Sequence, residues 1–201
     1  MFKHVANQAL LQNISAYCMV IEFENRWISA VVIADAFAVS ALHSVPDCFR
    51  ENGTSVILRD DQGELHNAHV HGSNAISDYI VFRKDAGSFK NVPKVMSPQL
   101  IDKYIVIGCA FGEKSVSVRV GLNISSISTG SRGFFYGESG GIPGFSGGGV
   151  FCSRNGFLMG IARGNEYDGN ETHLYGNVLE MISAALILNN IEVFGHQPFS
   201  V

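Results

Sequence analysis

The stretch Gly144-Phe145-Ser146-Gly147-Gly148, at residues 144–148, precedes two short apolar runs that predict a β-hairpin. The runs are residues 150–152 and 157–162, and the dipeptide Asn155-Gly156 between them favours a tight turn. A serine between glycines on a tight turn exposes its hydroxyl, and flanking backbone N–H groups can converge on a developing oxyanion. Ser146 is therefore a candidate nucleophile, which would require a histidine and a carboxylate elsewhere in the chain.

Upstream of this stretch, short apolar runs bounded by turn residues predict many further strands. They are residues 17–23, 27–33, 37–40, 55–58, 68–71, 79–83, 104–107, 115–120, 124–128 and 133–136. Residues 5–14 and 177–190 carry apolar side chains at helical spacing and predict a short helix near each end. Two sets of about six strands with terminal helices predict an all-β double barrel.

The expected division places one barrel in residues 1–92 and the other in 93–201, both within one domain. Residues 84–99, which contain Gly87, Pro93 and Pro98, are expected to connect the two halves.

Composition narrows the function classes. The chain has 201 residues, of which 46% are hydrophobic, and a formal net charge of −4, so neither disorder nor a global attraction to nucleic acid is expected. The N-terminus is too polar for a secretory signal, and no apolar run reaches membrane-spanning length. The four cysteines show no zinc-binding spacing and are expected to be reduced, in a cytoplasmic protein without membrane contact or cofactor.

Two residues of the first half stand where the chemistry of a serine nucleophile needs them. His43 follows the apolar run 37–40, and Asp78 begins the apolar run 79–83. Serine needs a neutral histidine to take its proton, and a carboxylate must hold the histidine ring and stabilise its protonated form. Taken singly, His43 also fits a core histidine and Asp78 a turn aspartate; Asp61 and Asp85 are rivals in more polar surroundings.

Three further histidines raise the question of a metal site. Of His66, His69 and His71, the last two share a strand face, and no cysteine or carboxylate is expected to complete a set of ligands. We therefore expect no metal ion.

The order His43, Asp78, Ser146 resembles that of the chymotrypsin-like endopeptidases of the PA clan. Ser40-Ala41-Leu42-His43 is similar to the segment that carries the family histidine, and Gly144 to Ile161 is similar to the Gly-x-Ser-Gly-Gly hairpin. The resemblance covers residues 5–180 through motifs rather than continuous identity. It implies a serine-type endopeptidase acting on polypeptides through an acyl-enzyme, with the backbone N–H groups of Gly144 and Ser146 as oxyanion donors.

Within the clan, the chain resembles most the 3C-like processing proteases of picornaviruses and their relatives. Residues 9–14 resemble their N-terminal helix, and residues 160–165 resemble their Gly-x-His-x-Gly-Gly-Asn stretch, which implies that Ala162, Arg163 and Gly164 contact substrate. This resemblance implies polyprotein processing in a host cytoplasm.

Two departures stand out. Most such proteases use cysteine where this chain has Ser146, which fits either a natural serine variant or an engineered replacement. Ala162 stands where the family has the histidine that recognises a glutamine side chain in the residue before the cleaved bond. The alternative is that this chain prefers an apolar or small residue at that substrate position.

Gly137-Glu138-Ser139-Gly140-Gly141 also resembles the family signature. Ser139 is followed by Ile142-Pro143-Gly144, which is a poor start for a strand, whereas Ser146 is followed by the hairpin. Ser146 is therefore preferred.

Two other functions stay open. A protease fold used for binding RNA or a protein is suggested by Ala162 and by the basic residues Arg83, Lys84, Lys90 and Lys94. A quality-control protease of the Deg/HtrA type shares the Gly-x-Ser-Gly-Gly turn.

Overall fold

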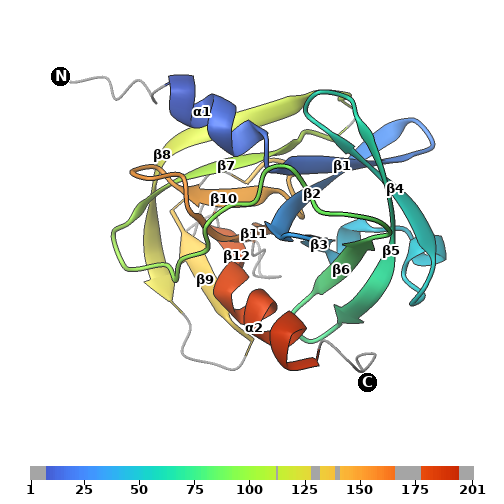
Figure 1. Ribbon diagram of the computed structural model, residues 1–201. Helices are drawn as coiled ribbons and strands as arrows, with labels where there is room; N and C mark the ends of the chain where they lie inside the picture. Colours follow the sequence, from blue (N-terminus) through green and yellow to red (C-terminus); the bar gives the residue numbers. More distant parts are fainter. Residues whose placement is uncertain (1–7, 112, 128–131, 139–140, 166–177, 195–201) are drawn as a thin grey trace.

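Two closed, six-stranded antiparallel β-barrels form the molecule, as a computed structural model shows (Figure 1). The structure describes residues 8–111, 113–127, 132–138, 141–165 and 178–194. The expected all-β double barrel with a short helix near each end is confirmed, and the fold is of the chymotrypsin-like type.

The first barrel has the strand order β1-β2-β3-β6-β5-β4. Its strands are β1 (Cys18–Phe23), β2 (Arg26–Ala34), β3 (Phe37–Ala41), β4 (Ser55–Asp60), β5 (Leu65–Asn74) and β6 (Tyr79–Lys84). Two short 3-10 segments, Leu42–Ser44 and Asp47–Phe49, follow β3. Side chains alternate along β5 between buried and more exposed positions, as expected of a strand with one face toward the barrel core.

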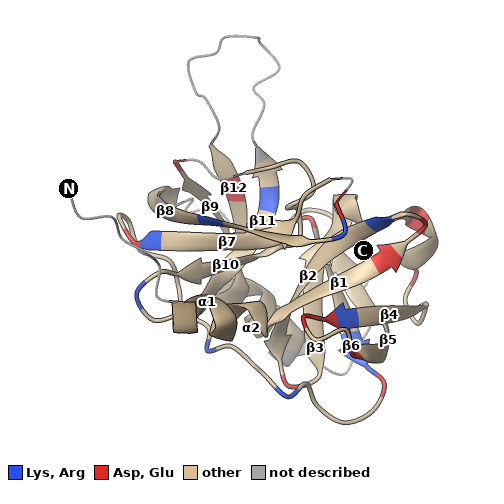
Figure 2. Cartoon of the chain, turned by 90° about the horizontal axis from the view of Figure 1, so that it is seen from above, with Lys and Arg blue, Asp and Glu red and all other residues tan. Residues whose placement is uncertain are grey.

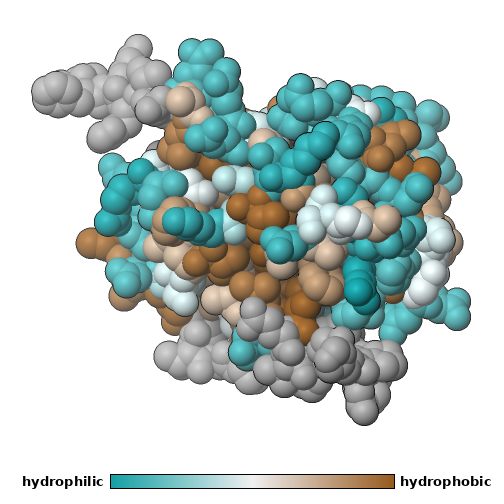
Figure 3. All heavy atoms as spheres, viewed as in Figure 1, coloured by the Kyte–Doolittle hydropathy of each residue, from teal (hydrophilic) through white to brown (hydrophobic). Residues whose placement is uncertain are grey.

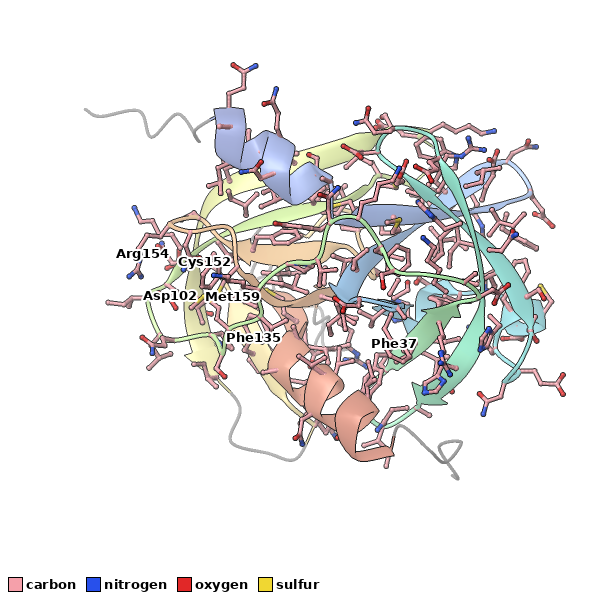
Figure 4. The ribbon with its side chains drawn as sticks, viewed as in Figure 1. Phe37, Asp102, Phe135, Cys152, Arg154 and Met159 are labelled. Atoms are coloured by element: carbon pink, nitrogen blue, oxygen red, sulfur yellow. The ribbon has the colours of Figure 1, made fainter. Side chains whose placement is uncertain are left out.

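The second barrel has the order β10-β11-β12-β9-β8-β7. Its strands are β7 (Lys103–Cys109), β8 (Val116–Ile127), β9 (Phe134–Gly137), β10 (Gly149–Cys152), β11 (Leu158–Asn165) and β12 (Leu179–Ser183). Phe135, Cys152 and Met159 pack in its core, and Arg154 forms an ion pair of 3.0 Å with the buried Asp102; all five residues are labelled in Figure 4.

Helix α1 (Gln8–Ser15) packs against the turn between β10 and β11, where a side chain on Gly156 would meet Leu10 and Ile14. Helix α2 (Ala184–Phe194) follows β12 and buries Ile187 and Ile191 in a core cluster that also contains residues of both barrels. Figure 3 shows this face of the molecule, where a hydrophobic area lies at the centre among mostly hydrophilic surface. None of the helices in the described ranges is long and apolar enough to cross a membrane.

The prediction of a helix over 177–190 is wrong at its start. Residues 179–183 form β12, and the helix begins only at Ala184. Leu, Glu and Met favour helices in isolation, but β12 pairs with both β11 and β9 and closes the barrel, so pairing and burial override local preference.

The two strands predicted at 115–120 and 124–128 are one strand. β8 runs unbroken from Val116 to Ile127, pairing with β7 along its first part and with β9 along its last part. Both pairings contain a register shift, and the shift against β9, between Ile124 and Ser126, lies where the apolar and polar residues stop alternating.

Candidate active site

His43 and Asp78 are brought together by the pairing of β3 with β6. Ala41 lies opposite Tyr79 in this pair, so the residues just beyond the strand ends are neighbours. The backbone N–H of Leu42 donates to the carbonyl of Asp78 over 3.0 Å. Asp78 has a φ of 58°, in the left-handed region that Asp adopts more readily than most residues. The strand-end histidine and strand-start aspartate therefore meet at one edge of the first barrel.

Ser146 completes a chain of hydrogen bonds from the second barrel. His43 Nδ1 lies 2.6 Å from Asp78 Oδ2, and the His43 backbone N–H donates to Asp78 Oδ1 over 3.0 Å. On the other side of the ring, His43 Nε2 lies 3.0 Å from Ser146 Oγ. The three residues predicted from separate motifs are thus assembled in the geometry of a nucleophile, a base and an orienting carboxylate.

The carboxyl group of Asp78 is held ionised. Its burial alone would raise the pKa, but hydrogen bonds and charge from His43 and a hydrogen bond from Arg163 outweigh burial and lower the pKa below its ordinary value of 3.8. An ionised Asp78 can hold the imidazole ring and stabilise its protonated form.

The turn before Ser146 is held by the first barrel. The Ser29 hydroxyl donates to the carbonyl of Gly144 over 3.2 Å and accepts from the backbone N–H of Cys109 over 2.8 Å. Phe145 is 1% exposed and packs in the second-barrel core. Among the described residues, no backbone carbonyl accepts from the N–H of Gly144 or Ser146. Both N–H groups are therefore available to donate to a substrate oxygen, and their role as oxyanion donors stays a prediction.

Gly144 has a φ of 98°, and a Cβ there would overlap backbone atoms of Phe111 and Cys109. Only glycine fits this position of the turn.

Gly147 provides a test of how tightly the two barrels meet. It has a φ of 87°, and a Cβ there would overlap Ser40 Oγ and Ser29 O of the first barrel. We expect Gly147→Ala to lower the free energy of unfolding by about 3 kcal/mol, because overlap adds to backbone strain. Gly63→Ala is the matched control: its φ is 82° but nothing described lies within 4 Å of the added Cβ, so strain alone should cost about 1 kcal/mol. Equal urea midpoints for the two variants would contradict the predicted overlap.

The residues implied by resemblance to contact substrate lie in different surroundings. Ala162 is 0% exposed and packs in the second-barrel core. Arg163 has its carbonyl 2.8 Å from Ser146 Oγ, while its guanidinium turns to Asp78. Gly164 is half-buried, with space around it. Contact with substrate stays a prediction for all three.

The rival candidates lie elsewhere. Asp61 accepts from the Gln62 side chain, and Asp85 binds His69, so neither hydrogen-bonds His43. Ser139 lies outside the described residues.

The three histidines considered for metal binding do not gather. His69 pairs with Asp85 at 2.7 Å, whereas His66 lies 3.1 Å from Asp60. The expectation that no carboxylate would stand with these histidines is wrong for His66: Asp60, Glu64 and His66 bring ligand atoms within 4.8 Å of one another. The β4–β5 turn brings these residues together, which spacing along a single strand did not indicate.

Of the four basic residues that suggested RNA binding, Lys84, Lys90 and Lys94 have interactions within the protein. The fourth is Arg83. Lys90 forms an ion pair of 2.6 Å with Glu64, and the Lys84 ammonium lies 5.2 Å from the centre of the Phe89 ring. RNA binding stays a prediction.

Sequence reasoning missed two residues at the site. Ser29, on β2, holds the Gly144 turn, and Glu180, on β12, forms an ion pair with Arg163. A small polar residue within the apolar run 27–33 was the only signal for Ser29. An acidic residue in a buried apolar segment was the signal for Glu180, and it was obscured by the helix prediction.

The fold and the assembled residues define a chymotrypsin-like double barrel with a Ser-His-Asp arrangement between its barrels. Among solved structures, the chain is similar to a serine endoprotease from Yersinia pestis, with a TM-score of 0.71 and 22% identity. The match covers 96% of this chain and 67% of the Yersinia chain. At this identity it shows a shared fold alone. No protein-family model and no curated protein sequence matches the chain.

Proposed function

We propose that the protein is a serine endopeptidase with Ser146 as nucleophile, His43 as general base and Asp78 as orienting carboxylate. The observation that carries this proposal is the distance of 3.0 Å between His43 Nε2 and Ser146 Oγ, on a ring held by Asp78 at 2.6 Å. The fold of the Yersinia endoprotease supports it.

The reaction proceeds in two halves. Ser146 Oγ attacks the carbonyl carbon of the scissile bond while its proton moves to His43 Nε2, and the carbonyl oxygen becomes an oxyanion facing the N–H groups of Gly144 and Ser146. The intermediate collapses, the C–N bond breaks, and His43 donates its proton to the leaving amine. Water then attacks the acyl-enzyme with His43 again as base, which releases the acid and restores Ser146.

In the resting arrangement the Ser146 hydroxyl lies within hydrogen-bonding distance of both His43 Nε2 and the Arg163 carbonyl. Its single proton can be donated to only one of them at a time. Attack requires the rotamer that donates to His43, so a substrate that occupies the Arg163 carbonyl would favour the reactive arrangement.

Two finer roles follow from this activity. Processing of a viral polyprotein in the 3C-like manner predicts cleavage at a few defined sequences, with a small or apolar residue before the cleaved bond because Ala162 carries no hydrogen-bonding group. Quality control of the Deg/HtrA kind predicts many cleavages in unfolded chains. We favour the 3C-like role on the sequence resemblance at residues 9–14 and 160–165.

Mass-spectrometric profiling of a peptide library tests both levels. The wild-type protein should cleave, and the Ser146→Ala protein prepared in parallel should not. A narrow preference at one position would support defined processing, and broad cleavage of unfolded proteins would support quality control. Identical product patterns for the two proteins would overturn the assignment of Ser146.

A further inference from the structure

Arg163 links the aspartate of the site to a second buried carboxylate. It lies on β11 at a register shift between Ala162 and Gly164. Its Nε donates to Asp78 Oδ2 over 2.9 Å, and its Nη1 forms an ion pair with Glu180 Oε2. Figure 2 shows a basic position on β11 and an acidic position on the paired strand β12. The guanidinium therefore bridges an acidic residue from each barrel.

Glu180 is built into the second barrel. Its side chain is 7% exposed, and it stands opposite Gly164 on β11 and Tyr136 on β9. The Tyr136 hydroxyl lies 3.3 Å from Glu180 Oε1, so Tyr136 and Arg163 each bind one carboxylate oxygen. The Arg163 guanidinium also lies 5.2 Å from the centre of the Phe134 ring. A buried carboxylate with these partners gives Arg163 a fixed anchor.

Asp78 Oδ2 is shared between two donors. His43 Nδ1 lies 2.6 Å from it, and Arg163 Nε lies 2.9 Å from it. Burial would lower the pKa of Arg163, but its interactions with Glu180 and Asp78 outweigh burial and raise it, so the guanidinium stays charged. The charged groups near His43 are Asp78, Arg163 and Glu180, together with Arg50, whose Nη2 donates to the His43 carbonyl over 3.4 Å. His43 itself gains charge when it takes a proton.

We propose that Arg163 is a positioning residue for Asp78, anchored by Glu180, which fixes the carboxylate that faces His43 and offsets part of the negative charge around it. This role rests on the proposed endopeptidase function. It differs from the substrate contact that resemblance implied for Arg163, because it acts through Asp78.

Loss of Arg163 changes the net charge around His43. Arg163→Met removes a positive charge beside two carboxylates, so protonation of His43 becomes easier. We expect the acid limb of the kcat/KM profile to move to higher pH by about 0.5–1 unit, with kcat reduced roughly tenfold and KM nearly unchanged. Glu180→Gln removes a negative charge and should move the limb to lower pH.

The double variant Arg163→Met/Glu180→Gln separates charge from folding. It has the net charge of the wild type, so its acid limb should lie between those of the single variants. Arg163→Met leaves Glu180 buried without its partner and this variant could fail to fold. In that case the acid limb of the double variant is compared with that of Glu180→Gln, because these two proteins differ only in the loss of Arg163. The matched control is Arg154→Met, which breaks an ion pair with the buried Asp102 in the same barrel and should leave the acid limb in place.

NMR titration of the His43 imidazole, identified by the resonance missing in His43→Gln, follows the same displacement without substrate. The pH midpoint of the His43 titration should be highest in Arg163→Met, intermediate in the double variant and lowest in Glu180→Gln, and this order would support the proposal. It would do so even if the wild type hydrolysed no peptide, because that result would contradict only the proposed function. Coincident titrations in all four proteins, or a KM increase without change in kcat, would overturn it.

Discussion

Ser146→Ala is expected to lower kcat for peptide hydrolysis by about 10⁵- to 10⁶-fold. The variant has no atom to form the acyl-enzyme, and the hydrogen bond of 3.0 Å to His43 Nε2 is lost. Activity remaining above the uncatalysed rate would come from the oxyanion donors and from substrate binding. The measurement is a progress curve on a peptide chosen from the library, at high enzyme concentration.

Two other serines serve as controls. Ser139→Ala tests the second Gly-rich signature directly, and Ser153→Ala removes a hydroxyl from the turn after β10. Both should keep activity within about threefold of the wild type, because the proposed nucleophile that lies 3.0 Å from His43 Nε2 is Ser146. If Ser139→Ala were inactive and Ser146→Ala active, the nucleophile would have to be reassigned.

The site could be predicted from sequence where each residue has a local signal. His43 ends an apolar run, Asp78 begins one, and Ser146 stands in a Gly-rich turn before a hairpin. Each signal comes from a strand boundary: the pairing of β3 with β6 brings the first two together, and the meeting of the two barrels brings Ser146 within 3.0 Å of His43 Nε2. Strand ends and tight turns leave a signal in the neighbouring residues, so three weak motifs together could indicate the arrangement.

The residues that support the site have no comparable local signal. Ser29 acts on Gly144, which lies 115 positions away in sequence, and Glu180 acts on Arg163 across neighbouring strands. Their roles follow from which strands pair and how the barrels meet. The prediction of a helix over 177–190 gave no reason to single out Glu180, whereas the structure places it on β12 and buries it.

Asp78→Asn is expected to lower kcat by about 10⁴-fold while the chain still folds. The amide cannot stabilise a protonated His43. An amide N–H facing His43 Nδ1 would also force the ring tautomer whose Nε2 carries a proton, which cannot accept the proton of Ser146. Asp85→Asn is the matched control, because Asp85 pairs with His69 at 2.7 Å in an exposed position. It should leave kcat unchanged, and an equal loss in both variants would contradict the role of Asp78.

Asp78→Asn is also expected to change how the free energy of unfolding depends on pH. The pKa of Asp78 is lowered in the folded protein, although burial opposes this, because His43 and Arg163 bind the ionised form. Its contribution to stability is therefore fully present above its ordinary value of 3.8 and is lost as pH falls through the lower folded value. Asp78→Asn has no such contribution to lose.

Urea unfolding should show the wild type more stable than the variant near neutral pH, with the difference shrinking below a pH of about 4. A difference that stayed constant down to the acid limit of folding would mean that the ionised form of Asp78 is not favoured by the fold, and the orienting role would lose its physical basis.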